Sequence, residues 1–119
     1  MLEAKSSTVA RWALVFIFLY HGLVSKLLWV HSSEVALVAA GPTLGFTPEL
    51  LVRVAGIAEV VWALLLIVFW QARWPLYLSA AALSGLFAGA AVLAPDTLVA
   101  AFNPVSLTVG ALALVWIAL

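Results

Sequence analysis

The chain has 119 residues, of which 67% are hydrophobic and 8% are charged. Soluble domains carry roughly a quarter charged residues, and an aqueous fold with this composition would expose large apolar patches. Five basic residues balance five acidic residues, so no electrostatic argument favours nucleic acid as a partner. The chain has no cysteine, which excludes disulfides, thiolate metal sites and a dithiol relay within it. An all-α membrane protein is therefore the predicted class.

Four segments approach the roughly 20 apolar residues that a transmembrane helix needs, namely residues 11–29, 48–70, 74–94 and 104–119. The N-terminus begins like a signal peptide, but its apolar run is long and no small-residue cleavage site follows, so it is interpreted as a retained first helix. Trp74-Pro75 and Asn103-Pro104 mark the starts of the third and fourth helices, with Asn103 as an N-cap. We predict a single domain over residues 1–119, built as a four-transmembrane-helix bundle.

The connection over residues 30–47 is long enough to contain structure. Ser32 or Ser33 is expected to cap a short helix that runs through Ala40 and ends at Gly41-Pro42. Glu34 is expected in its first turn, and residues 35–38 are apolar, so we expect this short helix to lie at the membrane interface. A second short stretch, over residues 96–102, precedes the fourth helix on the same side.

The orientation follows from the basic residues in the flanks of the helices. Lys5 and Arg11 flank the first helix on its N-terminal side, and Arg73 lies in the tight turn between the second and third helices. The two loops on the other side contain no lysine or arginine. Both termini are therefore predicted to face the cytoplasm, in a multi-pass protein of the cell inner membrane.

Four ionisable residues fall inside the predicted membrane helices: His21, Lys26, Arg53 and Glu59. Such groups are costly in lipid, so each needs a partner or a function. Counting from the outer ends, Lys26 and Arg53 lie within roughly one helical turn of the surface, and His21 and Glu59 lie about 10–15 Å deeper. At 100° per residue the polar and small residues of each helix share one face, spanning roughly 140° and 120°. The pattern predicts an internal polar site with an upper basic layer and a lower His/Glu layer.

A purely structural role is the alternative for each of these groups. Lys26 and Arg53 are close enough to the interface to snorkel. Glu59 has no basic residue one turn away, so it is expected to be neutral or to be held by His21 or Arg53. A structural pair of His21 with Glu59 therefore stands beside the interpretation of Glu59 as a functional group.

Other types of site find little support in the sequence. His21 and His31 would point about 80° apart even on one continuous helix, and no HExxH or ExxH spacing is present, so neither a metal site nor a haem is expected. The third helix carries small residues at four-residue spacing, a pattern typical of helix–helix contacts in lipid. A second copy or a partner protein is expected to dock through these residues, which are Ala81, Gly85 and Gly89.

Three stretches together resemble the DoxX-like family of small four-helix membrane proteins: ARWALVFIFLYHGLVSKLLWVHSSEVALVAAGPTLG, GIAEVVWALLLIV and APDTLVAAFNPVSL. The resemblance covers nearly the whole chain and is carried by GLVSK, by the Ala58-Glu59 pair and by Asn103-Pro104. It implies a four-helix fold, with Gly22, Ser25, Lys26 and Glu59 at the family's motif positions. Many members carry a Lys-Asn pair after the last proline, whereas this chain reads Val105-Ser106-Leu107-Thr108, so the resemblance implies a less basic site here.

The resemblance also implies a redox context, because the family takes its name from a subunit associated with a thiosulfate:quinone oxidoreductase. The leading hypothesis is a membrane module that binds a quinone-like or other lipophilic small molecule and works beside a redox enzyme partner. No covalently bound cofactor is expected. The predicted ligand-binding residues are His21, Ser25, Lys26, Arg53, Glu59 and Asn103. The alternatives are a non-catalytic assembly or scaffold subunit and a small transporter.

Overall fold

The computed structural model describes residues 2–29, 31–99 and 103–119, with the side chains in these ranges except those of residues 2–4, 25 and 33. Within this part the chain forms helices and no strand. In chain order the elements are α1 (Leu2–Gly22), the π-helix η1 (Leu23–Leu28), α2 (Ser32–Ala39), α3 (Pro48–Val68), α4 (Trp74–Leu93), the 3-10 helix η2 (Pro95–Val99) and α5 (Pro104–Ala118).

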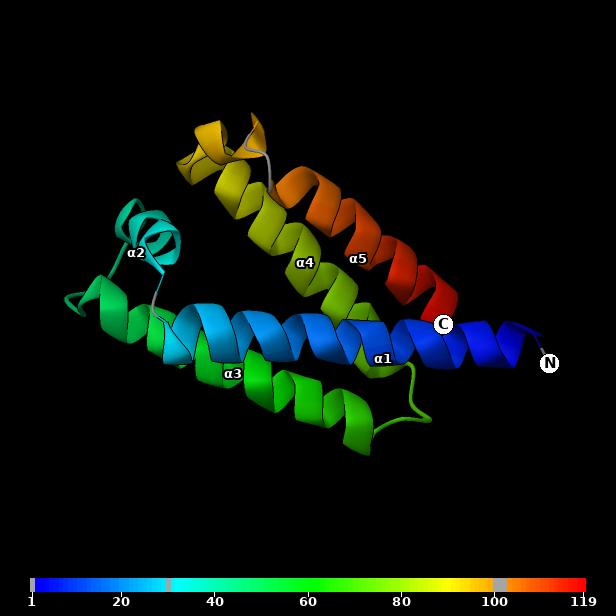
Figure 1. Cartoon of the computed structure of the whole chain (residues 1–119). Helices are drawn as coiled ribbons and strands as arrows, with labels where there is room; N and C mark the ends of the chain where they lie inside the picture. Colours follow the sequence, from blue (N-terminus) through cyan, green and yellow to red (C-terminus); the bar gives the residue numbers. More distant parts are fainter. Residues whose placement is uncertain (1, 30, 100–102) are drawn as a thin grey trace.

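By their contacts, the four long helices follow one another in the order α3, α1, α5, α4. Figure 1 shows α1 beside α3, and α4 beside α5. α1 packs along α3 on one side and against α5 on the other, and α4 packs against α5. α3 and α4 follow each other in the chain but share few contacts. The start of α1 and the end of α5 lie at the same end of the molecule, where the Ser7 hydroxyl donates a hydrogen bond of 2.8 Å to the Ala118 carbonyl.

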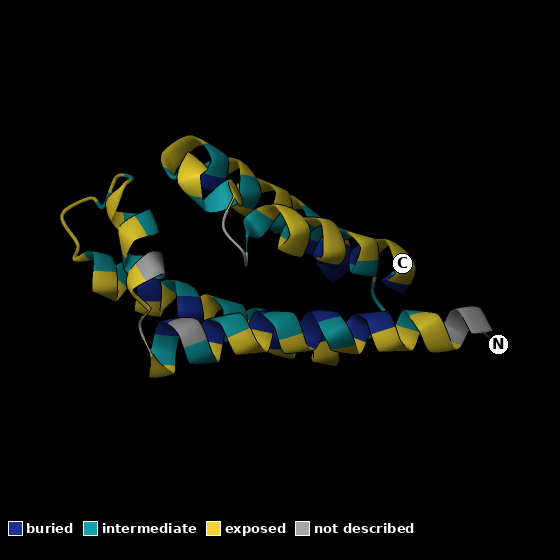
Figure 2. Cartoon of the chain, turned by 45° about the horizontal axis from the view of Figure 1, so that its top comes forward, coloured by how far each residue is buried: buried dark blue, intermediate teal, exposed yellow. Residues whose placement is uncertain are grey.

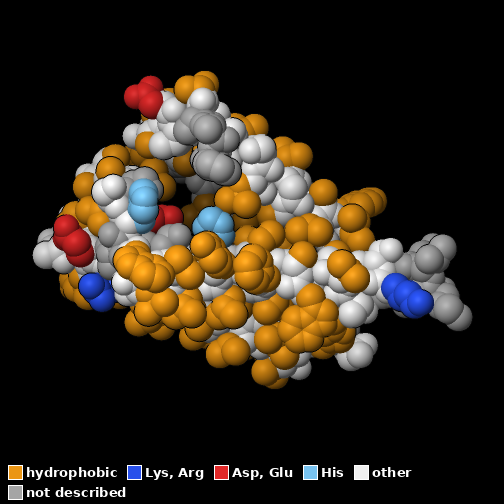
Figure 3. Space-filling model, viewed as in Figure 1, with side chains coloured by type: hydrophobic (Ala, Val, Ile, Leu, Met, Phe, Trp, Pro, Cys, Tyr) orange, Lys and Arg blue, Asp and Glu red, His pale blue; other side chains and the backbone are white. Residues whose placement is uncertain are grey.

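The apolar core lies where all four long helices approach one another, around the first half of α1. Leu14 of α1, Leu66 of α3, Leu76 of α4 and Val115 of α5 are almost fully buried in it. Much of the remaining helical surface is apolar and exposed, as the exposed faces in Figure 2 and the hydrophobic side chains in Figure 3 show. Helices with apolar residues on both their inner and outer faces are suited to a lipid environment.

Three helices are long and apolar enough to cross a membrane: Lys5–Leu28, Pro48–Val68 and Trp74–Leu93. α5 is a shorter apolar helix of 15 residues. At 1.5 Å per residue it extends about 22 Å, less than the roughly 30 Å of a bilayer's hydrocarbon core. Three of the four predicted spans thus have the length of a membrane helix.

The predicted boundaries of the later helices agree with the structure within two residues. α3 begins at Pro48 and α4 at Trp74, as expected. Asn103 caps α5 as predicted, because its Oδ1 accepts a hydrogen bond of 3.0 Å from the Ser106 backbone N–H. The Thr47 hydroxyl does the same for α3, accepting from the Leu50 N–H at 3.2 Å.

The N-terminal half differs from the prediction in two places. α1 begins at residue 2 rather than 11, because residues ahead of the apolar run can extend a helix without being apolar themselves. The short helix α2 is present, but the residue before it is His31, whose carbonyl accepts from the Glu34 and Val35 N–H groups at 3.1 and 3.2 Å. A serine cap at position 32 or 33 is therefore wrong.

Candidate functional site

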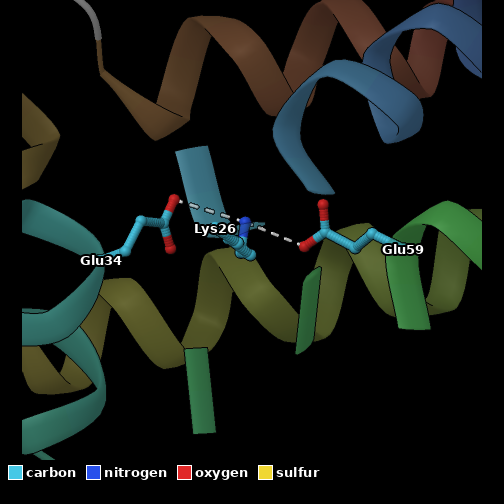
Figure 4. A network of polar contacts seen from close by, with 3 residues as sticks. All are labelled: Lys26, Glu34 and Glu59. Carbon is cyan, nitrogen blue, oxygen red and sulfur yellow. Dashed lines mark hydrogen bonds and ion pairs between the residues drawn. The ribbon is translucent and has the colours of Figure 1, made fainter. Parts of the chain in front are cut away.

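A buried lysine lies between two carboxylates at the end of α1 that is remote from the chain termini. The Lys26 Nζ is 3.0 Å from the Glu59 Oε1 and 3.4 Å from the Glu34 Oε1 (Figure 4). The Lys26 side chain is 10% exposed, against 24% for Glu34 and 19% for Glu59. We call these three residues the Lys26 cluster. It joins η1, α2 and α3 at one point.

Lys26 lies in the π-helical segment that ends the first long helix. There the Trp29 N–H donates to the Val24 carbonyl five residues back, at 2.9 Å. A π turn contains more residues than an α turn, so it changes the direction of the side chains that follow relative to those before it. Short π segments are rare and are found frequently at functional sites.

Two glycines allow α1 and α3 to approach closely beside the Lys26 cluster. A Cβ added at Gly22 would lie 2.7 Å from the Gly56 carbonyl oxygen and 2.9 Å from the Glu59 Cβ. A Cβ added at Gly56 would lie 2.7 Å from the Lys26 Cβ and 2.8 Å from the Gly22 carbonyl oxygen. Since only glycine fits at either position without movement, the two backbones are in contact here. This contact brings the Lys26 side chain within reach of Glu59.

The charges of the Lys26 cluster do not balance when all three groups are ionised. One ammonium faces two carboxylates, which leaves one excess negative charge among these three groups. Burying charge in an apolar environment is costly, and pairing offsets only part of that cost. Within the same part no group of three or more His, Cys, Asp and Glu residues could hold a metal ion.

The structure joins two of the predicted site residues, Lys26 and Glu59, but arranges them differently from the prediction. Glu59 is held by Lys26 and not by His21 or Arg53. Separate basic and His/Glu layers are therefore wrong, because the long lysine side chain extends along the helix to the depth of the carboxylate. Arg53 is exposed and makes no ion pair with the described carboxylates.

The remaining predicted residues lie around the cluster or have other roles. His21 is half-buried and meets the Tyr20 ring edge-on, with the ring centroids 6.4 Å apart. Asn103 acts as the N-cap of α5. The Ser25 side chain lies outside the described part, so its predicted role stays a prediction.

The sequence reasoning missed Glu34 as a member of the site. Glu34 was interpreted only as an acidic residue in the first turn of the interfacial helix, where it also lies. Its distance of eight residues from Lys26 does not by itself place the two together. The fold brings them into contact because α2 turns back over η1 and packs against α3.

Arg11 is a second residue whose position the sequence did not reveal. It was interpreted as a flanking charge, yet it is only 5% exposed. Its Nη1 donates to the Leu66 carbonyl at 3.0 Å and its Nη2 to the Ala72 carbonyl at 2.6 Å. Its guanidinium also lies 5.2 Å from the centroid of the Trp70 ring. Arg11 thus satisfies one carbonyl in the last turn of α3, where a positive charge is favourable, and one in the connection to α4.

The comparison with known proteins points to one family. No curated protein and no solved structure is significantly similar to this chain. The model of the DoxX-like family matches residues 15–116, which include all three members of the Lys26 cluster. The match covers most of the chain and agrees with the apolar helices of the structure. The chain therefore belongs to the DoxX-like family and is a membrane protein.

Proposed function

We propose that this protein is a membrane module of a redox-associated system that binds a quinone-like or other lipophilic small molecule at the Lys26 cluster. The observation that carries the proposal is the burial of Lys26 between Glu34 and Glu59, among helices whose outer faces are apolar. Binding sites for small molecules combine an apolar lining with a few convergent polar groups. Ionisable groups inside membrane helices are by default candidates for functional sites.

The two parts of such a ligand correspond to two parts of the molecule. Apolar helix faces accept the tail, and the Lys26 cluster meets the polar head. Both Glu34 and Glu59 remain partly accessible, at 24% and 19% exposure of their side chains. Reduction and oxidation of a quinone move protons as well as electrons, and carboxylates and the nearby His21 are groups that exchange protons. The electrons come from or go to a redox partner protein.

The arrangement in the membrane belongs to the same proposal. We infer four spans, with α5 crossing as the shortest, and both termini on the cytoplasmic side of the inner membrane. An even number of spans requires the two chain ends to lie on one side, and the Ser7 to Ala118 hydrogen bond places the start of α1 beside the end of α5.

Replacing Lys26 with methionine tests the proposal, with Arg53→Met as the matched control on the exposed side of α3. Purified protein in lipid nanodiscs is equilibrated with a short-chain quinone, and bound quinone is measured after separation from empty nanodiscs. Loss of one charged hydrogen bond predicts affinity at least about tenfold weaker in Lys26→Met, with Arg53→Met within about twofold of the wild type. Equal affinity in wild type and Lys26→Met contradicts the assignment of the site.

A second candidate function is that of an assembly subunit, and one observation favours it. Gly85 and Gly89 on α4 have no atom within 4 Å of an added Cβ, and Ala81 on the same helix is exposed. This leaves an open strip of small residues, which in lipid allows close approach of another helix. Gly85→Leu is expected to dissociate a homo-oligomer or to release a partner, as measured by crosslinking in native membranes. An unchanged crosslinking pattern argues against an interface on this face of α4.

A further inference from the structure

The Lys26 cluster has many more hydrogen-bond acceptor positions than donors. A lysine ammonium has three N–H donors, whereas each ionised carboxylate offers about four acceptor positions. Two of the lysine donors are engaged by the Oε1 atoms of Glu34 and Glu59. No other described side chain donates a hydrogen bond to either carboxylate. In Figure 4 a single oxygen of each carboxylate is joined to Lys26, and the second oxygen lies outside these contacts.

The net charge of the cluster also restricts the kind of ligand head that can bind. With one ammonium and two carboxylates the cluster carries an excess negative charge, so an anionic head would meet repulsion from both glutamates. A head that only accepts hydrogen bonds can use the third N–H of Lys26 and nothing else in the cluster. A head with a hydroxyl group can donate to either carboxylate, and hydrogen bonds to charged acceptors are the stronger kind.

Lys26 and Glu59 lie in helices of membrane-spanning length, and this restricts the chemical type of hydrogen-bond donor further. A head that arrives from the bilayer must pass through an apolar region, and this costs far more for a charged ammonium than for a neutral hydroxyl. A neutral hydroxyl donor therefore combines access through lipid with complementarity to the free carboxylate oxygens.

We propose that the Lys26 cluster selects lipophilic phenols or hydroquinones, with the free carboxylate oxygens of Glu59 and Glu34 as the acceptors of the ligand hydroxyl. This inference rests on the proposed function and specifies its ligand: the reduced, hydroxyl-bearing form binds more tightly than the quinone. Glu34 and Glu59 come from α2 and α3, so the hydroxyl head would link the interfacial helix to the membrane helix on binding.

A matched pair of ligands tests the preference without a redox reaction. 4-Decylphenol carries the hydroxyl donor, and 4-decylanisole replaces it with a methyl ether of similar size that only accepts. Their affinities for the protein in nanodiscs are measured beside that of a short-chain quinone and corrected for partition into empty nanodiscs. The phenol is expected to bind at least about tenfold more tightly than the anisole, as for loss of one hydrogen bond to a charged group.

Three variants then assign the acceptors. In Glu59→Gln and Glu34→Gln the ratio of the phenol affinity to the anisole affinity is expected to fall by about threefold or more. The matched control is Glu49→Gln, an exposed carboxylate in the first turn of α3, and it should leave the ratio unchanged. Helical content by circular dichroism confirms that each variant is folded. If Glu59→Gln does not fold, Glu34→Gln on the surface helix decides the question.

Each result separates this inference from the proposed function. Equal affinity for phenol, anisole and quinone, with all three weakened by Lys26→Met, overturns the donor preference and leaves the ligand site in place. A wild-type ratio that both Glu59→Gln and Glu34→Gln retain overturns the assignment of the carboxylates as acceptors. No saturable binding of any of the three ligands overturns the proposed function together with the inference.

Discussion

Replacing Gly22 with alanine tests the backbone contact between α1 and α3 on which the Lys26 cluster depends. The new Cβ would lie 2.7 Å from the Gly56 carbonyl oxygen and 3.1 Å from the Val60 backbone nitrogen. Both are backbone atoms of a helix and cannot rotate away. Ordinary van der Waals contact would require the helices to separate by roughly 0.5–1 Å, a case of overpacking that costs about 1–3 kcal/mol.

The matched control is Gly85→Ala on α4, because an added Cβ at Gly85 meets no atom within 4 Å. Both substitutions gain the same helix propensity, about 0.5–1 kcal/mol, so this term cancels when the two variants are compared. Gly22→Ala is therefore expected to be about 1–3 kcal/mol less stable than Gly85→Ala.

Reversible unfolding in mixed micelles, followed by circular dichroism, measures this difference in the free energy of unfolding. A Gly22→Ala variant as stable as Gly85→Ala would refute the close contact of the two backbones. The same separation of α1 and α3 would lengthen the distance between Lys26 and Glu59, so weaker ligand binding should accompany the loss of stability. Normal ligand affinity in a destabilised Gly22→Ala variant would show that the site does not depend on this contact.

Three further substitutions test polar contacts that position the helices, each read out as the free energy of unfolding in micelles. Arg11→Met removes two hydrogen bonds to backbone carbonyls and should lower the free energy of unfolding by about 2–4 kcal/mol. The control Arg73→Met, in the exposed turn, should change it by less than about 0.5 kcal/mol. Equal effects of the two substitutions would contradict the role of Arg11. Ser79→Ala leaves the Trp62 N–H without its acceptor at 2.8 Å and should cost about 1 kcal/mol, with exposed Ser84→Ala near neutral. Asn103→Ala removes the cap of α5 and should lower the free energy of unfolding by about 1 kcal/mol. An unchanged free energy of unfolding would show that water accepts the Ser106 N–H hydrogen bond equally well.

The residue pattern was sufficient to predict the helices because their signals are local. Apolar runs, the prolines at the helix starts and the asparagine cap act within a few residues of the chain, so Pro48, Trp74 and Pro104 begin helices where expected. The family followed from motif order along the chain, and the match over residues 15–116 confirms it. The presence of Lys26 and Glu59 in a shared site was also predicted, because both fall on the faces that carry the small residues.

Which side chains contact one another within the site was harder to predict from the sequence. Counting at 100° per residue assumes a continuous α-helix, and the π segment from Leu23 to Leu28 breaks that assumption where Lys26 lies. The depth count treated each side chain as lying at its own Cα level, although a lysine side chain extends over more than a helical turn. Arg53 was consequently assigned to the site, whereas its side chain is exposed.

Composition and periodicity thus determined that the chain is an all-helical membrane protein with costly ionisable groups on its inner helix faces. Only the tertiary structure decided which of these groups meet. α2 brings Glu34 to Lys26, and the Gly22 and Gly56 contact brings Glu59 to the same ammonium. The physical reason is that contacts between helices depend on their separation and rotation, which are set by packing across the whole molecule and not by any local stretch of residues.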